Sequence, residues 1–231
     1  MLDIHTHILP GMDDGSRSVG QSIAMLEREA QQGMHVVALT PHYHADRDSP
    51  RHFIKRRKDA LDALHSAATG RADLPRLLAG AEVAYFDGMC RGADTDMLCI
   101  GDTNAMLIEM PFCRWTQRMY RELEELRFVR GIQPVLAHAE RYIPWQPPGF
   151  MERIRESGMM IQVNASFVTR WQTALKATAM LKRRGIHFIA SDCHDMERRP
   201  PAAGEARRRI ERRMDAAAAF LRGQEELLLE E

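Results

Sequence analysis

Short apolar runs alternate along the chain with longer segments whose apolar residues recur at helical spacing. The short runs predict strands at Leu2–His7, His35–Thr40, Leu77–Val83, Ala105–Met110, Gln133–His138, Met160–Asn164 and His187–Ser191. The longer segments predict helices at Val19–Gln32, Arg51–Ala68, Thr116–Arg130, Gly149–Glu156, Trp171–Arg184 and Ala203–Leu221. Glycines stand just before several strands, where helix C-terminal caps are expected, at Gly33, Gly131, Gly158 and Gly185.

The order of these elements predicts the fold class. The runs at His35–Thr40 and His187–Ser191 are apolar almost throughout, which is typical of parallel strands covered on both faces. About seven strand–helix units with no linker-like break favour a single domain over residues 1–231. We therefore predict an α/β fold, a distorted (β/α)7 TIM-like barrel, with an open doubly wound sheet as the alternative. The tail Gln224–Glu231 is either a frayed helix or an interface element.

Composition narrows the function classes. The 32 basic and 32 acidic residues cancel, so no overall field favours nucleic acid or an anionic membrane as a partner. The basic segment Glu197–Met214 is either a solvated helix face or a docking patch for an acidic partner. Polar residues occupy the N-terminus where a signal peptide needs an apolar run, and no apolar stretch is long enough to cross a bilayer. We therefore expect a cytoplasmic protein without membrane insertion.

Side chains that bind metals follow the predicted strands. His5 and His7 are two residues apart on the first strand, so their imidazoles point the same way. The others stand at or beyond later strand ends or in the first loop: Asp14, His42, Glu82, Glu109, His138, Asp192 and His194. Each alone is an ordinary solvated carboxylate or capped histidine. Because strand ends converge on one face of a β/α barrel, together they predict one site.

This grouping predicts divalent cations. Several carboxylates and imidazoles in one pocket would each cost on the order of several kcal/mol if left unpaired, and cations remove that conflict. A mixed imidazole and carboxylate set suits Mn, Fe or Zn. Cys193 lies between Asp192 and His194, so on a strand it would face away from them and is expected to pack.

The motifs, taken in order, resemble those of the polymerase and histidinol phosphatase (PHP) superfamily. More narrowly, the chain is similar to bacterial manganese-dependent tyrosine-protein phosphatases encoded with capsular and exopolysaccharide genes. The resemblance covers nearly the whole chain. It rests on Met1–Pro10 running into Asp13-Asp14-Gly15, then Thr40-Pro41-His42, Gly80-Ala81-Glu82, Leu107–Phe112, Ala137–Arg141 and Ser191–His194.

The resemblance implies three divalent ions, with Mn expected and Fe or Zn as alternatives. The implied ligands are His5, His7, Glu82 and Asp192 for the first ion, Glu82, Glu109 and His138 for the second, and Asp14, His42 and His194 for the third. Arg141 and Arg199 would bind the substrate phosphate as catalytic residues, and His44 lies close enough to the expected mouth to contact substrate. The implied partner is a tyrosine-phosphorylated protein, the C-terminal tail of a bacterial tyrosine kinase, and an oligomer stays open.

Two positions depart from the family or leave a choice. Ala139 stands where the family usually has Pro, which loosens the expected placement of Arg141. Arg198 and Arg199 are adjacent, so the sequence leaves open which one reaches the site. The aromatic residues Trp115, Tyr142 and Trp145 either form a wall for a phenyl ring or pack beneath loops.

Three other functions compete with metal-dependent tyrosine phosphatase activity. Cys193 and Arg199 have the spacing of thiol phosphatases, but the residues between them contain no Gly and two acids, a poor anion cradle. The same metal site could instead serve histidinol phosphate, another small phosphomonoester or a phosphodiester. The third alternative is a regulatory module that docks on a kinase without catalysis. An aryl phosphate suits the predicted site because a tyrosinate, with a pKa of about 10, leaves readily.

Overall fold

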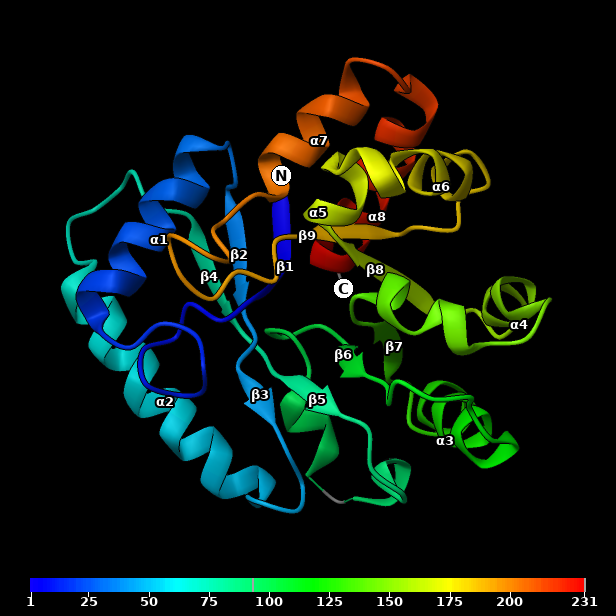
Figure 1. Cartoon of the computed structure of the whole chain (residues 1–231). Coiled ribbons are helices and arrows are strands. Elements are labelled where there is room, and N and C mark those ends of the chain that lie inside the picture. Colours follow the sequence, from blue (N-terminus) through cyan, green and yellow to red (C-terminus); the bar gives the residue numbers. More distant parts are fainter. Residues whose placement is uncertain (93, 231) are drawn as a thin grey trace.

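The computed structural model describes residues 1–92 and 94–230. A parallel sheet curls around a common interior, and most helices lie on its outer side (Figure 1). The strands are β1 (Leu2–Thr6), β2 (Val36–Leu39), β3 (His42–Tyr43), β4 (Arg76–Ala79), β5 (Glu82–Ala84), β6 (Ala105–Glu109), β7 (Gln133–Leu136), β8 (Met160–Asn164) and β9 (Phe188–Ala190). The α-helices are α1 (Val19–Gln31), α2 (Pro50–Ala67), α3 (Gln117–Phe128), α4 (Phe150–Glu156), α5 (Ala165–Thr169), α6 (Trp171–Lys182), α7 (Ala203–Glu211) and α8 (Asp215–Glu230). Short 3-10 helices are η1 (Met89–Arg91), η2 (Thr95–Leu98), η3 (Ala139–Arg141) and η4 (Ile143–Trp145).

The predicted strand Leu77–Val83 is interrupted, and the predicted strand His35–Thr40 is followed by a further short strand, β3. The hydrogen-bonded order is β1-β2-β4 in one group and β3-β5-β6-β7-β8-β9 in the other, with every pair parallel. Pro41, which lacks an N–H, separates β2 from β3, and Gly80-Ala81 separates β4 from β5. Backbone bonds from Gly80 N to Leu39 O (2.9 Å) and from Glu82 N to Pro41 O (3.1 Å) carry the pairing across both breaks.

The first strand lies beside the segment that follows the last. Thr6 and Cys193 form an isolated parallel bridge. The N–H of His7 donates to Cys193 O, and the N–H of Asp192 donates to His5 O, each at 2.9 Å. These bonds bring the two ends of the curled sheet together at the carboxyl ends of β1 and β9. The predicted α/β class with parallel strands is therefore confirmed.

The C-terminal region differs from the prediction in its boundaries. The single helix predicted at Ala203–Leu221 is two helices, and α8 continues through the tail to Glu230. Glu225 of α8 pairs with the buried Arg207 at 3.0 Å and accepts the Leu2 N–H at 3.3 Å. The tail is therefore a packed helix that holds the start of β1. Within the described residues, no helix combines the length and apolar character needed to span a bilayer.

Three arginines of the basic segment make contacts within the fold. Besides Arg207, the Arg208 guanidinium donates to Gln32 O at 2.7 Å and that of Arg209 to Thr169 O at 2.6 Å. These three arginines of α7 therefore fasten the helix to its neighbours. This favours a structural role for them over a docking patch.

Candidate metal centre

Glu82 lies at the middle of a group of imidazoles. Its Oε2 is 3.2 Å from His5 Nε2, 3.2 Å from His7 Nε2 and 3.0 Å from His42 Nδ1. Its Oε1 is 2.8 Å from His138 Nε2. All of these side chains except His42 are almost fully buried. One carboxylate of β5 thus faces four rings, which come from β1, the residue after it, β3 and the segment after β7.

Asp192 forms a second point of convergence. Its Oδ1 lies 3.4 Å from His5 Nε2 and 3.5 Å from His7 Nε2. Its Oδ2 lies 2.6 Å from an Nη2 of both Arg141 and Arg199. The same carboxylate therefore connects the imidazole cluster to two guanidinium groups.

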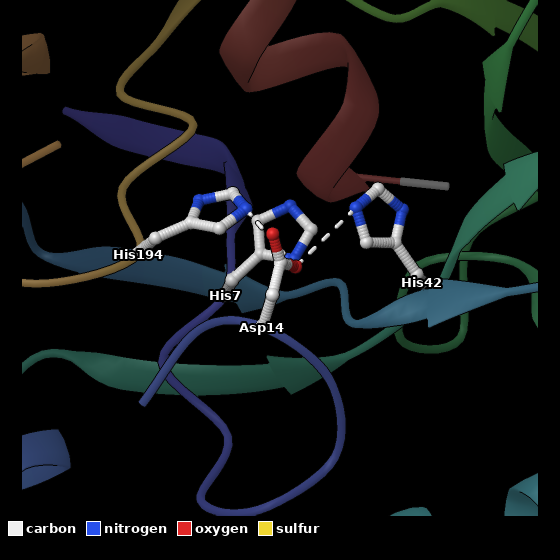
Figure 2. A group of neighbouring side chains, drawn as sticks. All are labelled: His7, Asp14, His42 and His194. Atoms are coloured by element: carbon white, nitrogen blue, oxygen red, sulfur yellow. Dashed lines mark ion pairs between the residues drawn. The ribbon is translucent and has the colours of Figure 1, made fainter. Parts of the chain in front are cut away.

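The remaining predicted ligands lie on either side of these two carboxylates. Asp14 Oδ1 is 3.7 Å from His42 Nε2 and 3.5 Å from His194 Nε2. Figure 2 shows this group of side chains: His7, Asp14, His42 and His194. Glu109 Oε1 is 3.4 Å from His138 Nε2. All nine side chains predicted from the sequence therefore meet in one place.

The donor atoms fit divalent cations. Several buried atoms have no hydrogen-bond partner among the described residues: His42 Nδ1, Glu82 Oε2, His138 Nδ1 and His194 Nε2. Ligand atoms fall within 4.8 Å of one another in three groups: His7 with Asp14, His42 and His194; His5 with His7 and Asp192; and His42 with Glu82 and Glu109. A mixed nitrogen and oxygen set of this kind suits Mn, Fe or Zn.

The pKa shifts of buried groups indicate that the pocket favours positive charge. Burial lowers the pKa of His7, but the surrounding carboxylates outweigh it and raise this pKa well above its usual value. The same balance, with Glu109 and Glu82 as neighbours, raises the pKa of His138 to about 9. Burial alone would raise the pKa of Glu82, yet nearby imidazoles, first that of His5, hold it well below its usual value. Bound cations would supply the same charge.

Two of the nine residues adopt unusual backbone conformations. His138 and Asp192 have φ values of 31° and 53°, in the left-handed region. Such a conformation costs on the order of 1–3 kcal/mol for a residue other than glycine and is typical of functional sites. Both N–H groups are held, that of His138 by Gln162 Oε1 at 2.6 Å and that of Asp192 by His5 O at 2.9 Å.

Asp13 has a role that the sequence did not reveal. Its Oδ2 accepts from His7 Nδ1 at 2.7 Å and from the His42 N–H at 2.8 Å. It therefore fixes the His7 ring with Nε2 toward the centre. Position 15 is a glycine because the loop returns directly onto His7. A Cβ added there would lie 2.2 Å from His7 O. The structure therefore requires glycine here for this close approach.

Gln162 and Asn164 of β8 were also missed. Gln162 Oε1 lies 3.1 Å from His5 Nδ1, and Asn164 Nδ2 donates to Asp192 Oδ2 at 2.8 Å. They position ligands in the way that polar partners usually orient metal-binding side chains. Their two-residue spacing on an apolar strand is the same signal that singled out His5 and His7, and it could have found them.

The structure distinguishes the two adjacent arginines. Arg199 contacts Asp192, whereas Arg198 is exposed and makes no such contact. Ala139 is fully buried in η3, and Arg141 still reaches Asp192.

Cys193 is fully buried, and burial, with Glu29 nearby, raises its thiol pKa well above its usual value. A thiol phosphatase mechanism therefore has no accessible nucleophile at this position.

Of the three aromatic residues considered in the sequence, two are buried and one is exposed. Trp115 and Tyr142 are buried with their rings 5.2 Å apart, so packing explains both. Phe112, which the sequence analysis did not single out, is 47% exposed, and its ring lies 6.1 Å from that of His138. Trp145 is also exposed. His44 lines a cavity of about 500 Å³ on the Asp14 side of the centre.

Comparison with known proteins identifies the family. The family profile described as "Capsular polysaccharide synthesis, CpsB/CapC" matches residues 1–223. Tyrosine-protein phosphatase YwqE of Bacillus subtilis is 30% identical over 210 residues, which cover 86% of this chain and 79% of that protein. Tyrosine-protein phosphatase CpsB of Streptococcus agalactiae is 27% identical over 219 residues, covering 89% of this chain and 88% of that protein.

A solved structure agrees with the sequence relatives. It belongs to a crystallographic study of YwqE from Bacillus subtilis and CpsB from Streptococcus pneumoniae, described as unique metal-dependent tyrosine phosphatases. It superposes with a TM-score of 0.85 at 27% identity, covering 100% of this chain and 94% of that chain. The chain therefore belongs to the CpsB/CapC family of capsular polysaccharide synthesis proteins.

Proposed function

We propose that this chain is a metal-dependent protein-tyrosine phosphatase acting on a tyrosine kinase that controls capsule or exopolysaccharide synthesis. The observation that carries the proposal is the meeting of nine His, Asp and Glu side chains around Glu82 and Asp192. Membership of the CpsB/CapC family supports it, since the relatives are named tyrosine-protein phosphatases. We further propose a single PHP-type domain over residues 1–231 with seven β/α units, supported by the contact between β1 and the segment after β9.

The proposed site holds three divalent ions, with Mn expected and Fe or Zn as alternatives. The proposed ligands are His5, His7, Glu82 and Asp192 for the first ion, Glu82, Glu109 and His138 for the second, and Asp14, His42 and His194 for the third. The shared position of Glu82 Oε1 and Oε2 between different imidazoles supports a bridging role for this carboxylate. When bound, such ions lower the pKa of water toward about 7 and neutralise phosphoryl oxygens.

The chain's own residues would position the substrate. Arg141 and Arg199 both reach Asp192 with one guanidinium nitrogen, which leaves further donors for phosphoryl oxygens. Arg is suited to this task because its planar fork matches a phosphate. The tyrosinate departs with little need for a general acid, because its pKa of about 10 makes it a good leaving group. His44 would contact substrate from the cavity on the Asp14 side.

The proposed partner is a tyrosine-phosphorylated kinase tail in the cytoplasm. Cavities of about 420 Å³ and 500 Å³ lie beside the metal centre and fall within the size range of ligand-binding pockets. The balanced charge of 32 basic and 32 acidic residues gives no support to nucleic acid as the ligand. An oligomer stays compatible with this proposal.

The decisive experiment removes the metals and offers competing substrates. Protein stripped with chelator should lose turnover of a phosphotyrosine peptide, and Mn should restore it. Glu82→Ala should remain inactive after Mn is added back, with circular dichroism showing a folded protein. Full turnover by stripped protein would refute the metal mechanism. Higher kcat/KM for histidinol phosphate than for the peptide would refute the proposed substrate while leaving the metal site intact.

A further inference from the structure

A second cavity adjoins the metal centre on the side of α5 and α6. It has a volume of about 420 Å³, within the range of ligand-binding sites. Its charged lining residues are Glu140, Arg141, Arg170, Asp192, Arg198 and Arg199. Four arginines therefore face two carboxylates, which leaves the cavity with an excess of positive charge.

Two of the four arginines in this cavity contact the metal centre, and two do not. Arg141 and Arg199 make this contact, since both guanidinium groups lie 2.6 Å from Asp192. Arg170 and Arg198 complete the arginine lining. Among residues 1–92 and 94–230, neither of these two guanidinium groups has an ion pair within 4.0 Å or a side-chain hydrogen bond. Arg170 and Arg198 therefore account for the excess positive charge of the cavity.

Both of these arginines project from fixed backbone. The Arg170 N–H donates to Ser166 O at 3.0 Å, and Arg170 O accepts from the Ala174 N–H at 3.0 Å. Arg209 of α7 further holds this turn through Thr169 O at 2.6 Å. A turn held at several points loses little backbone entropy when its side chain binds a ligand.

The Arg198 loop is fixed in a similar way. Asp195 Oδ1 accepts the N–H of Arg198 at 2.5 Å and that of Arg199 at 3.2 Å. The His194 N–H donates to Arg199 O at 2.9 Å. The same hydrogen-bonded loop thus carries Arg199, which contacts Asp192, and Arg198, which lines the cavity.

We propose that Arg170 and Arg198 form a carboxylate-binding subsite that recognises an acidic residue beside the phosphotyrosine of the substrate. This inference rests on the proposed function, because it takes Arg141 and Arg199 as the phosphate-binding residues of the same cavity. An extended peptide advances about 3.3–3.6 Å per residue, so the Cα of a Glu one or two positions from the phosphotyrosine lies about 3–7 Å farther along the chain. Guanidinium groups suit a carboxylate because they can donate two parallel hydrogen bonds.

The test uses three phosphotyrosine peptides that differ only beside the phosphotyrosine. One has Glu at the two preceding positions, one has Glu at the two following positions, and one has Gln at all four. The wild-type protein with Mn should turn over one Glu peptide with a kcat/KM about fivefold above the Gln peptide, the upper range for a solvent-accessible ion pair. Phenyl phosphate serves as the substrate without flanking residues.

Variants then assign the preference to the two arginines. Arg170→Gln and Arg198→Gln should each reduce the Glu-to-Gln ratio, and the double variant should bring it to about one. Because the ratio compares two peptides on one variant, any common effect on catalysis cancels. Arg183→Gln is the matched control: Arg183 lies just beyond the other end of α6, about 20 Å from Arg170 along the helix axis, and its variant should retain the wild-type ratio.

The outcomes separate this inference from the proposed function. Equal wild-type kcat/KM on all three peptides, or an undiminished ratio in the double variant, would overturn the carboxylate subsite. A reduced ratio in Arg183→Gln as well would attribute the preference to overall charge and also overturn it. Absence of phenyl phosphate turnover by the Mn-loaded wild type would instead refute the phosphatase function itself.

Discussion

Asp13 offers the most direct test of how the metal centre is built, because it contacts the predicted ligands without being one. Its Oδ2 accepts from His7 Nδ1 at 2.7 Å and from the His42 N–H at 2.8 Å, and its Oδ1 accepts from the Gly15 N–H at 2.9 Å. Asp13→Asn keeps the size of the side chain. Oδ2 serves both His7 and the His42 N–H, so an amide oxygen at Oδ1 turns the NH2 toward His7 Nδ1, and an amide oxygen at Oδ2 turns it toward the Gly15 N–H. Either orientation removes the negative charge that favours hydrogen on His7 Nδ1 and leaves its Nε2 free for a metal.

The expected loss follows from weaker control of the His7 tautomer. A His7 ring protonated at Nε2 has no lone pair toward Glu82 and Asp192, which lie 3.2 Å and 3.5 Å away from that nitrogen. Replacing a partner that orients a metal ligand typically reduces metal affinity about 10–100-fold. That range corresponds to about 1.4–2.7 kcal/mol of binding free energy. Asp13→Asn should therefore need correspondingly more Mn for half-maximal activity, with a smaller change in activity at saturating Mn.

The assay titrates chelator-treated protein with Mn and follows both a competing metal dye and aryl phosphate turnover. Asp102→Asn is the control, since Asp102 is exposed and precedes β6, at the strand end away from the metal centre. Thermal unfolding in chelator checks that the variant protein folds. Mn affinity of Asp13→Asn within twofold of wild type would refute the idea that Asp13 orients His7 for metal binding.

Three further predictions concern residues outside the ligand set. Cys193→Ser should retain kcat within about twofold, because the buried thiol does not face the cavity; loss of turnover with an intact fold would revive a thiol mechanism. Burial lowers the pKa of His187 to about 4, so its contribution to stability is complete above pH 6.5 and declines as the pH falls toward 4. The difference in unfolding free energy between wild type and His187→Gln, measured in chelator, should accordingly shrink by about 1–2 kcal/mol from pH 7.5 to pH 5, allowing for the partial exposure of the ring; an unchanged difference would contradict the burial argument. Phe112→Ala should raise KM for phenyl phosphate about 2–10-fold but leave KM for glycerol phosphate unchanged, since only an aryl ring can stack on the exposed Phe112; equal effects on both substrates would point to a general loss of site structure.

Much of the molecule follows from local patterns in the sequence. Apolar runs such as Val36–Leu39 and Phe188–Ala190 identify parallel strands because both of their faces are covered. The HxH spacing of His5 and His7 directs both rings to one side of β1, and strand ends in such folds converge. Those two regularities, together with family motifs, were sufficient to assemble all nine candidate ligands from the sequence alone.

Contacts between distant segments were decided only by the tertiary structure. Asp13 looks like an ordinary turn residue until the loop folds back onto His7 and His42, and Gln162 looks like a strand residue until His5 and His138 reach it. The choice of Arg199 over Arg198 depends on a loop held by Asp195. The sequence determined which chemical groups point toward the carboxyl ends of the strands, because side-chain direction along a strand is local. Which groups orient them depends on close packing between elements far apart in the chain, and no local periodicity encodes that.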